Sequence, residues 1–262
     1  MLLSMKKTKT DSASTAQTSP KLGIIWARSG KSKRSPRPSL SREQIVRAAI
    51  DIADAEGMET LSIRQIAAKL GVSTMALYWY VESKDDVLDL MIDAAYAEIL
   101  FPPQPSTDWR ADCTNLAKHV RTVMRRHPWL AALSSNRPLL GPNALKLHEY
   151  LFATLSLLGL DPQITLGLVE IVGAYLRGFV QQELGEAEAQ RRSGLSETEW
   201  RMSVDPYIHD HVIASGQYPH LADYFSHVEK WDNDKRFDFG LDFLLDSMSV
   251  RAQQLGVAEH DV

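Results

Sequence analysis

Apolar residues along this chain recur at the spacing of helices and only rarely alternate as they would in strands. In the run SIRQIAAKLGVSTMALYWYV, a first helix is predicted from Ser62 to Leu70, and Gly71 then supplies the left-handed residue that commonly ends a helix. Ser73 can cap a second helix directly afterwards. Because so short a connection forces two helices to cross steeply, the pattern predicts a helix-turn-helix.

The second of these helices has two unlike faces. Leu77 and Val81 lie four residues apart and share one face, whereas Met75, Tyr78 and Trp79 lie on roughly the opposite side. A protein gains little by exposing three large side chains together, so we expect this face to meet a partner, and the major groove of duplex DNA admits an α-helix. On this pattern alone the alternative stays open that Tyr78 and Trp79 are core residues of an ordinary bundle.

Helix start and stop signals extend the domain on both sides. Ser41 begins a helix that Gly57 ends, and a further helix begins at Lys84 and continues to Ile99. Each helix of this region except the one at Ser73 opens with a serine followed three residues later by Gln or Asp, which is the spacing of a capping box. The prolines of PPQP then interrupt the chain.

The rest of the chain is also predicted to be helical, so the fold class is all-α. Its expected helices are Thr107–Arg126, Trp129–Leu133, Pro142–Leu158, Pro162–Ala189, a short one from Ser196, Pro206–Ala214, Pro219–His227 and Arg236–Leu255. We therefore predict a flexible basic arm over residues 1–39, a helix-turn-helix domain over 40–100 and a helical domain over 106–256.

Charge is distributed unevenly along the chain. The formal net charge is −4, yet residues 1–39 carry nine Lys and Arg side chains against Asp11 alone. Such an arm suits contact with phosphates or insertion into a minor groove, and a solvated tail without a role is the alternative. The apolar island LGIIWA within the arm can dock on the folded body.

The single cysteine, Cys113, cannot form an intramolecular disulfide and suits a reducing cytoplasm, where we expect it as a small buried residue. The N-terminus lacks an apolar run long enough for a secretory signal. Glu170 and Arg177 interrupt the apolar stretch LGLVEIVGAYLRGFV. We therefore expect a cytoplasmic protein with no membrane span.

Familiar catalytic and nucleotide-binding motifs such as GxSxG, GxGxxG, GKS/T and HExxH do not occur in the sequence, so we expect neither an enzyme nor a cofactor. His209, Asp210 and His211 form the one compact cluster of possible metal ligands. Histidines two residues apart point to different sides of a helix, so a solvated face is the better interpretation and no metal site is predicted. A helical small-molecule-binding or catalytic protein without DNA binding remains the alternative function.

Three segments of residues 40–100, REQIVRAAIDIADAEG, LSIRQIAAKLGVS and ALYWYVESKDDVL, resemble the DNA-binding region of the TetR family of bacterial transcriptional regulators. LYWYV followed by Ser83 and Lys84 is particularly similar to the tetracycline repressor branch. The resemblance implies double-stranded DNA as partner, bound by a homodimeric repressor at a palindromic operator. The residues expected at the DNA are Arg42, Arg64, Gln65, Thr74, Met75, Ala76, Tyr78, Trp79, Tyr80 and Lys84.

The segment RFDFGLDFLLDSM resembles the terminal helix of that family's C-terminal domain, which implies a four-helix dimer interface with a second copy. Its expected members are Phe239, Gly240, Phe243, Leu244 and Ser247, with Gly240 permitting close approach of helices. The alternative is a stripe of intrachain core, because core and interface stripes look alike.

In the same family the C-terminal domain encloses a small-molecule pocket whose occupancy changes the separation of the two recognition helices. The residues expected around it here are Trp109, Trp129, Leu133, Asn136, Arg137, Tyr150, Glu170, Tyr175 and Phe179, with ordinary core packing as the alternative for each. Where the tetracycline repressor places two magnesium-binding histidines, this chain has Leu133 and Ala174, which supply no metal ligand. We therefore expect an effector more apolar than magnesium-tetracycline.

Overall fold

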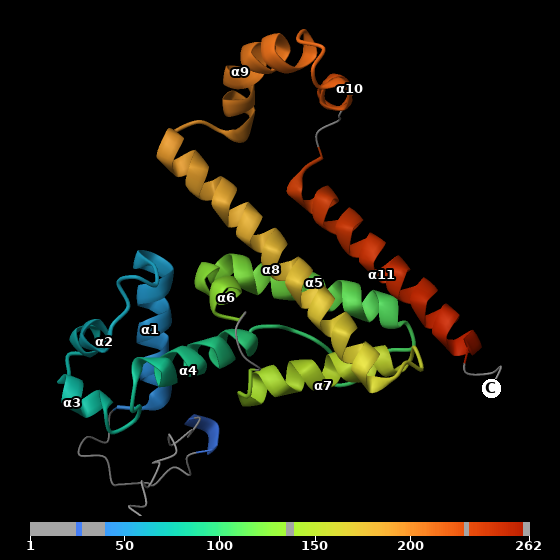
Figure 1. The fold of residues 1–262 in the computed structure, drawn as a ribbon. Helices are drawn as coiled ribbons and strands as arrows, with labels where there is room; N and C mark the ends of the chain where they lie inside the picture. The colour runs from blue at the N-terminus through green and yellow to red at the C-terminus, as the bar shows by residue number, and fades with distance from the viewer. Residues whose placement is uncertain (1–24, 28–39, 135–138, 228–230, 259–262) are drawn as a thin grey trace, which may run out of the picture.

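The computed structural model describes residues 25–27, 40–134, 139–227 and 231–258, and these residues form helices and no strand, which confirms the all-α prediction (Figure 1). The first helices are the short turn η1 (Ile25–Ala27), α1 (Arg42–Glu56), α2 (Ile63–Lys69), α3 (Thr74–Leu77) and α4 (Lys84–Tyr96). The second group comprises α5 (Trp109–Arg126), α6 (Pro128–Leu133), α7 (Pro142–Ser156), α8 (Pro162–Ser193), α9 (Glu197–Ile208), η2 (His209–Ile213), α10 (Pro219–His227) and α11 (Asn233–Ala258).

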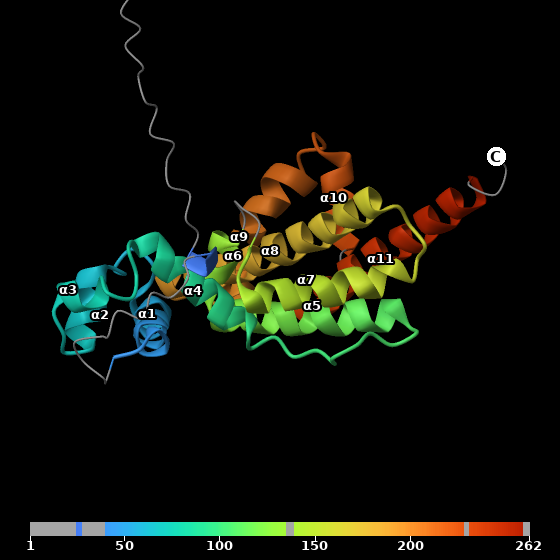
Figure 2. The ribbon, with the colours of Figure 1, turned by 90° about the horizontal axis from the view of Figure 1, so that it is seen from below.

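The helices form two bodies joined by α4. Helices α1 to α3 make a small unit at one end, and in the larger body α8 crosses α5 and α7 and packs along α11 (Figures 1 and 2). Helices α9 and α10 project beyond this body, and none of their residues is buried within the chain. Contacts of α1 with α6 and of α4 with α7 connect the small unit and α4 to the larger body.

Local hydrogen bonds explain where the helices of the small unit begin. Ser41 and Gln44 form a complete capping box, and the Ser62 hydroxyl accepts a bond of 3.2 Å from the backbone N–H of Gln65. The predicted box at Ser62 is nevertheless incomplete, because the Gln65 side chain accepts from the serine hydroxyl and not from its backbone. At the start of α4, likewise, the Asp86 carboxylate accepts from the backbone of Glu82, one residue further out than predicted.

Pro206 does not begin a helix as predicted. It lies inside α9, which continues to Ile208 and then widens into the π-turn η2. A proline in a helix leaves one carbonyl without its donor, and α9 is exposed, so water can hydrogen-bond to that carbonyl. Proline was therefore a poor boundary signal at this surface position.

Within the described residues, α8 is the one helix with the length and apolar composition that crossing a membrane would require. It packs against α5, α6, α7 and α11 within the larger body. Of its most apolar window, 28% is buried by these contacts.

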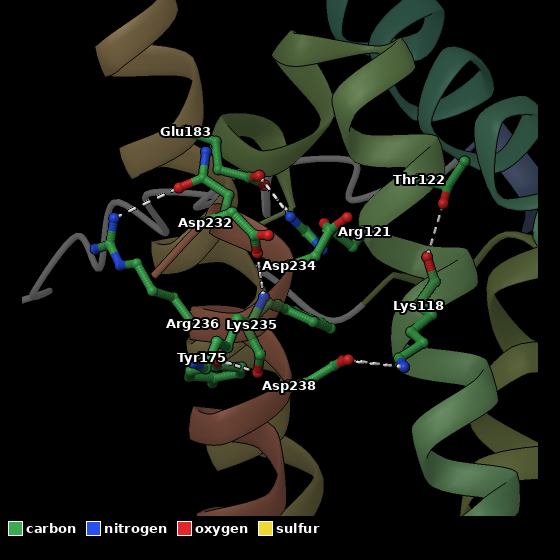
Figure 3. Close-up of polar contacts among 12 residues, drawn as sticks. Lys118, Arg121, Thr122, Tyr175, Glu183, Asp232, Asp234, Lys235, Arg236 and Asp238 are labelled. Atoms are coloured by element: carbon green, nitrogen blue, oxygen red, sulfur yellow. Dashed lines mark hydrogen bonds and ion pairs between the residues drawn. The ribbon is translucent and has the colours of Figure 1, made fainter. Parts of the chain in front are cut away.

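A nearly buried arginine ties three helices of the larger body together (Figure 3). Arg121 of α5 bonds both carboxylate oxygens of Glu183 on α8, at 3.0 and 2.6 Å, and reaches Asp234 of α11 at 2.8 Å. Its guanidinium also lies 4.5 Å from the centre of the Phe237 ring. Burial opposes its charge, but the hydrogen bonds and charges of Glu183 and Asp234 outweigh that effect and raise the pKa of Arg121.

The two bodies meet at a polar junction around His127, which is 4% exposed. Its Nδ1 lies 2.9 Å from the Asp54 carboxylate of α1, and its Nε2 lies 3.2 Å from the Glu98 carboxylate just after α4. The indole N–H of Trp129 in α6 donates to the same Asp54 carboxylate at 2.7 Å. One carboxylate of the small unit thus accepts from two side chains of the larger body.

A second junction joins α4 to α7. The buried Asp93 carboxylate of α4 accepts from the backbone N–H groups of Asn143 and Ala144, at 2.8 and 3.1 Å, and so caps the start of α7. A Cβ atom at Gly141 would overlap the Asp93 side chain, so this approach requires glycine. Movement of α7 is in this way tied directly to α4.

The apolar island of the N-terminal arm docks as predicted, since Ile25 is 2% exposed within the hydrophobic core and Trp26 is partly buried. The remainder of the arm lies outside the described residues.

Replacing Arg121 should strongly destabilise the larger body. Arg121→Ala leaves the Glu183 carboxylate, 8% exposed, without its partner, and we expect the free energy of unfolding to fall by about 3–5 kcal/mol in urea denaturation. Lys118→Ala is the matched control on α5, because the Lys118 ion pair with Asp238 is half exposed and should contribute less than about 1 kcal/mol. Equal losses for the two variants would contradict the assigned role of Arg121.

Removing the shared acceptor at the junction should also cost stability. Asp54→Ala leaves the Trp129 and His127 N–H groups without their acceptor, for an expected loss of about 1–3 kcal/mol in the same measurement. Asp51→Ala removes a neighbouring carboxylate whose pair with Lys69 is exposed, and should change stability by less than about 1 kcal/mol. If Asp54→Ala unfolds like wild type, the junction does not hold the bodies together.

Candidate DNA-binding surface and effector cavity

The aliphatic side of the second helix in the helix-turn-helix anchors it to the small unit. Leu77 is fully buried and Val81 is 1% exposed. The helix itself is shorter than the sequence suggests, since α3 ends at Leu77 and residues 78–80 form turns. The backbone N–H of Val81 still donates to the Leu77 carbonyl at 3.1 Å, so the chain keeps helical direction and Val81 remains on the buried side.

The opposite side of α3 faces outward, as predicted. Met75 is 69% exposed, Tyr78 48% and Trp79 53%, although each is a large side chain. The alternative that Tyr78 and Trp79 are core residues is therefore wrong. In Figure 1, α3 lies at the outer edge of the small unit, on the side away from α9 and α10.

The other residues expected at the DNA surround this surface with varying exposure. Arg64 and Lys84 are exposed at the first turns of α2 and α4, whereas Thr74, Ala76 and Tyr80 are partly buried. The side chains of Arg42 and Gln65 also make hydrogen bonds within the chain. The Nε of Arg42 donates to the Tyr80 carbonyl at 3.1 Å, which ties the start of α1 to the end of the α3 region, and Gln65 bonds to Ser62.

Along α11 the structure separates a core face from an exposed face. Phe237, Leu241, Leu245 and Met248 are buried against the rest of the chain. Of the residues expected at a dimer interface, Phe239, Phe243 and Ser247 are exposed and Leu244 is partly exposed.

Gly240 corrects part of the interface prediction. A Cβ atom at this position would lie 2.5 Å from the Tyr175 hydroxyl, and that hydroxyl donates to the Phe237 carbonyl at 2.7 Å. The close approach that this glycine permits is therefore made by α8 of its own chain. The pattern identified the close approach but not the helix that makes it.

A cavity of about 530 Å³ lies within the larger body, in the size range of sites for small organic molecules. Its wall is formed by residues from α4 to α8 and is mostly apolar. The lining residues are Tyr96, Cys113, Leu116, Ala117, Val120, Met124, Ser134, Leu139, Leu140, Leu145, Leu147, His148, Leu151, Phe152, Leu166, Val169, Glu170, Val172, Gly173, Leu176 and Arg177.

Of the residues expected around an effector pocket, only Glu170 lines this cavity among those that the structure describes, and Asn136 and Arg137 lie outside the described residues. Trp129 is held at the junction by Asp54, and Tyr150 packs on Phe101 with 5.0 Å between ring centres. Trp109 and Leu133 are partly buried against the core.

Tyr175 and Phe179 form an aromatic group with Phe237 of α11, away from the cavity wall. The prediction for these residues and for Trp109, Trp129, Leu133 and Tyr150 is wrong as a description of this cavity. Aromatic composition does not reveal which side of α8 a residue occupies. The lining residues Gly173 and Arg177 follow Glu170 at helical spacing, and that spacing was the available signal.

The ionisable residues of the cavity wall are in unlike states. Burial raises the pKa of the Cys113 thiol to about 12, so it stays neutral. Burial also raises the pKa of the Tyr96 hydroxyl, against the opposing effects of Ser134 and of the Arg177 charge. The other acidic and basic residues of the described wall are Glu170 and Arg177, seven residues apart on α8, and His148 on α7.

The described residues contain no group of three or more His, Cys, Asp or Glu side chains that could hold a metal ion. His211 stacks on Tyr207 with ring centres 4.3 Å apart, and His209 bonds to Asp210, all on an exposed surface. Leu133 and Ala174 do not line the cavity.

Comparison with known proteins extends these observations to a family. Residues 45–91 match the family model described as bacterial regulatory proteins, tetR family, and residues 101–252 match the tetracyclin repressor-like C-terminal domain. The chain is 36% identical over 252 residues, covering 94% of this chain and 90% of the relative, to the HTH-type transcriptional repressor DrrR1 of Streptomyces coeruleorubidus. An HTH-type transcriptional regulator of Saccharopolyspora erythraea is 35% identical over 243 residues, covering 91% of this chain and 96% of that protein.

Among solved structures, the TetR family protein ActR of Streptomyces coelicolor in complex with actinorhodin superposes with a TM-score of 0.68 at 24% identity, covering 81% of this chain and 98% of that one. At this identity the likeness concerns the fold, and it includes a helical body of the kind that encloses the cavity here. The helix-turn-helix surface, the helical body and both family models lead to one conclusion: the chain belongs to the TetR family of transcriptional regulators.

Proposed function

We propose that this protein is a transcriptional repressor that binds a palindromic operator as a homodimer and leaves it when a small molecule occupies the cavity. The observation that carries the proposal is the outward side of α3, where Met75, Tyr78 and Trp79 stand on a helix fixed by buried Leu77 and Val81. A rigidly anchored helix with an exposed side suits insertion into a major groove. The curated relatives, which are transcriptional regulators, favour this function over an enzymatic one.

In this proposal Thr74, Met75, Ala76, Tyr78 and Trp79 meet the groove. Arg64, Gln65, Tyr80 and Lys84 make the surrounding backbone contacts together with the part of the Arg42 guanidinium not bonded to Tyr80. Phosphates are the same in every DNA sequence, so the phosphate contacts supply affinity. Base edges differ between sequences, so the groove contacts supply sequence preference.

The partner in the dimer is a second copy of the chain, meeting it through the exposed face of α11. Phe239 and Phe243 are 59% and 65% exposed, one helical turn apart, and Ser247 continues that face. On the neighbouring α8, Ile171 is 49% exposed. Two α8–α11 pairs packed face to face would cover these side chains, and the two copies of α3 must then lie about 34–36 Å apart to reach successive major grooves.

Occupancy of the cavity reaches the DNA-binding unit through α4. Tyr96 of α4 lines the cavity, and Asp93 of the same helix caps α7, which forms another part of the wall. A molecule that favours a different position of Tyr96 and α7 therefore shifts α4, whose first residue is the expected phosphate contact Lys84. The response is a change in the populations of two arrangements, which needs a ligand that binds one of them more tightly.

Substitution of the outward aromatic residues should abolish specific binding. For Tyr78→Ala/Trp79→Ala we expect binding to the promoter DNA of its own gene to weaken by at least about thirtyfold in a gel-shift assay, since each lost contact costs about 1–3 kcal/mol. Tyr218→Ala, an exposed aromatic residue near α10, is the control and should bind as wild type. A helical binding protein without DNA function predicts no shift by any of the three proteins.

The exposed face of α11 can be tested by the mass of the assembly. Phe243→Asp places a charge in the proposed interface, so sedimentation at micromolar concentration should change from dimer to monomer. Leu157→Asp, at an exposed apolar position after α7, should remain dimeric. A Phe243→Asp protein that sediments as a dimer, or a monomeric wild type, would show that this face is not the interface.

A further inference from the structure

The cavity in the larger body contains a cation that no carboxylate of the described residues neutralises. Arg177 lines the wall and is partly buried, and its guanidinium makes no ion pair within the described part of the chain. The contrast with Arg121, which is held by Glu183 and Asp234, is direct. Taking a guanidinium partly out of water is unfavourable unless a negative or hydrogen-bond-accepting group meets it.

The position of Arg177 is set by its own helix. The guanidinium folds back over Gly173, where a Cβ atom would lie 3.0 Å from Nη1. Gly173 and Arg177 are one turn apart and both line the cavity, so the absence of a side chain at position 173 gives the guanidinium room against the helix. The planar guanidinium can donate two parallel hydrogen bonds to a carboxylate, which a lysine ammonium cannot do.

Neighbouring groups complete a polar end of the cavity beside α4. The Tyr96 hydroxyl stays neutral and lies close enough to feel the Arg177 charge and to interact with Ser134. The Ser134 hydroxyl donates to the Leu130 carbonyl at 2.6 Å, which leaves the serine oxygen as an acceptor toward Tyr96. The tyrosine hydroxyl carries a single hydrogen, so it donates either to Ser134 or, turned away from it, to a bound oxyanion beside the guanidinium.

The other end of the cavity has the opposite character. Glu170 precedes Arg177 by two turns, about 10 Å along the helix, and is exposed. An anion is therefore disfavoured beside Glu170 and favoured beside Arg177, with apolar wall between the two.

From this arrangement we propose that Arg177 is the residue that selects the effector, and that the effector is a largely apolar molecule carrying an ionised carboxylate or an equivalent oxyanion. The acidic group lies against Arg177 and Tyr96, and the apolar remainder of the molecule fills the aliphatic part of the cavity toward Glu170. This assignment rests on the proposed role of the cavity as the effector site. It also explains how charge recognition would act on α4, because Tyr96 belongs to that helix.

The test uses a matched pair of fluorescent probes, anthracene-2-carboxylic acid and its neutral carboxamide, titrated into the full chain at pH 7.5. Wild type should bind the acid at least about tenfold more tightly than the amide, as expected for one charge-assisted contact. Arg177→Gln should weaken only the acid and bring the two affinities to within about threefold of each other. Arg191→Gln removes an exposed arginine from the same helix and should retain the wild-type preference.

Thermal unfolding and the promoter gel shift of Arg177→Gln should match wild type, which separates loss of ligand recognition from loss of fold or of DNA binding. Equal wild-type affinities for acid and amide, an unchanged preference in Arg177→Gln, or no binding of either probe would each overturn the assignment. None of these outcomes bears on DNA recognition, which the gel shift measures by itself. Failure of the gel shift with normal probe selectivity would overturn the proposed repressor function and leave the anion site standing.

Discussion

The arrangement of the whole chain depends on the hydrogen bonds that the Asp54 carboxylate accepts from His127 and Trp129. This carboxylate belongs to α1 of the DNA-binding unit, and its two donors belong to the start of the helical body. Because His127 and Trp129 are each 4% exposed, breaking these bonds would leave two nearly buried side-chain N–H groups without their acceptor. The two bodies are therefore joined by a rigid polar contact as well as by the continuous chain of α4.

Rigid joining matters because the proposed function requires the transmission of small movements. A regulator with two recognition helices at fixed spacing is sensitive to rotations of each DNA-binding unit, and a loosely tethered unit would absorb them. Asp93 joins α4 to α7 in a similar way, since its carboxylate caps the helix that forms one side of the cavity. Helix α4 consequently belongs to both parts: it begins at Lys84 in the DNA-binding unit, and it ends at Tyr96 in the cavity wall.

Charge is used in two distinct ways within the larger body. Arg121 is neutralised by Glu183 and Asp234 and stacked near Phe237, so it fixes α5, α8 and α11 relative to one another. Arg177 lies on the same α8 but in the cavity wall, without a carboxylate partner among the described residues. The donors of Arg121 are thus used within the chain, whereas those of Arg177 can bind the acidic group of the proposed effector.

The sequence by itself determined the all-α class, the helix-turn-helix and the two-sided character of α3. These features rest on local causes: capping serines, glycines with positive φ, and the spacing that places Leu77 and Val81 on one side and Tyr78 and Trp79 on the other. The exposed stripe on α11 followed from the same periodicity. Each of these patterns involves residues that are close in sequence, so it can be recognised without knowing which distant segments pack against them.

The tertiary structure alone decided which residues surround the cavity and which helix approaches Gly240. Tyr175 and Phe179 have the composition of ligand-binding residues, yet the rotation of α8 turns them toward Phe237, whereas Gly173 and Arg177 face the cavity. The side that a residue occupies on a helix surrounded by neighbours depends on how those neighbours pack, and contacts such as Arg121 with Glu183 join positions far apart in the chain. Local periodicity defines the faces of a helix, and only the packing of distant segments decides what each face meets.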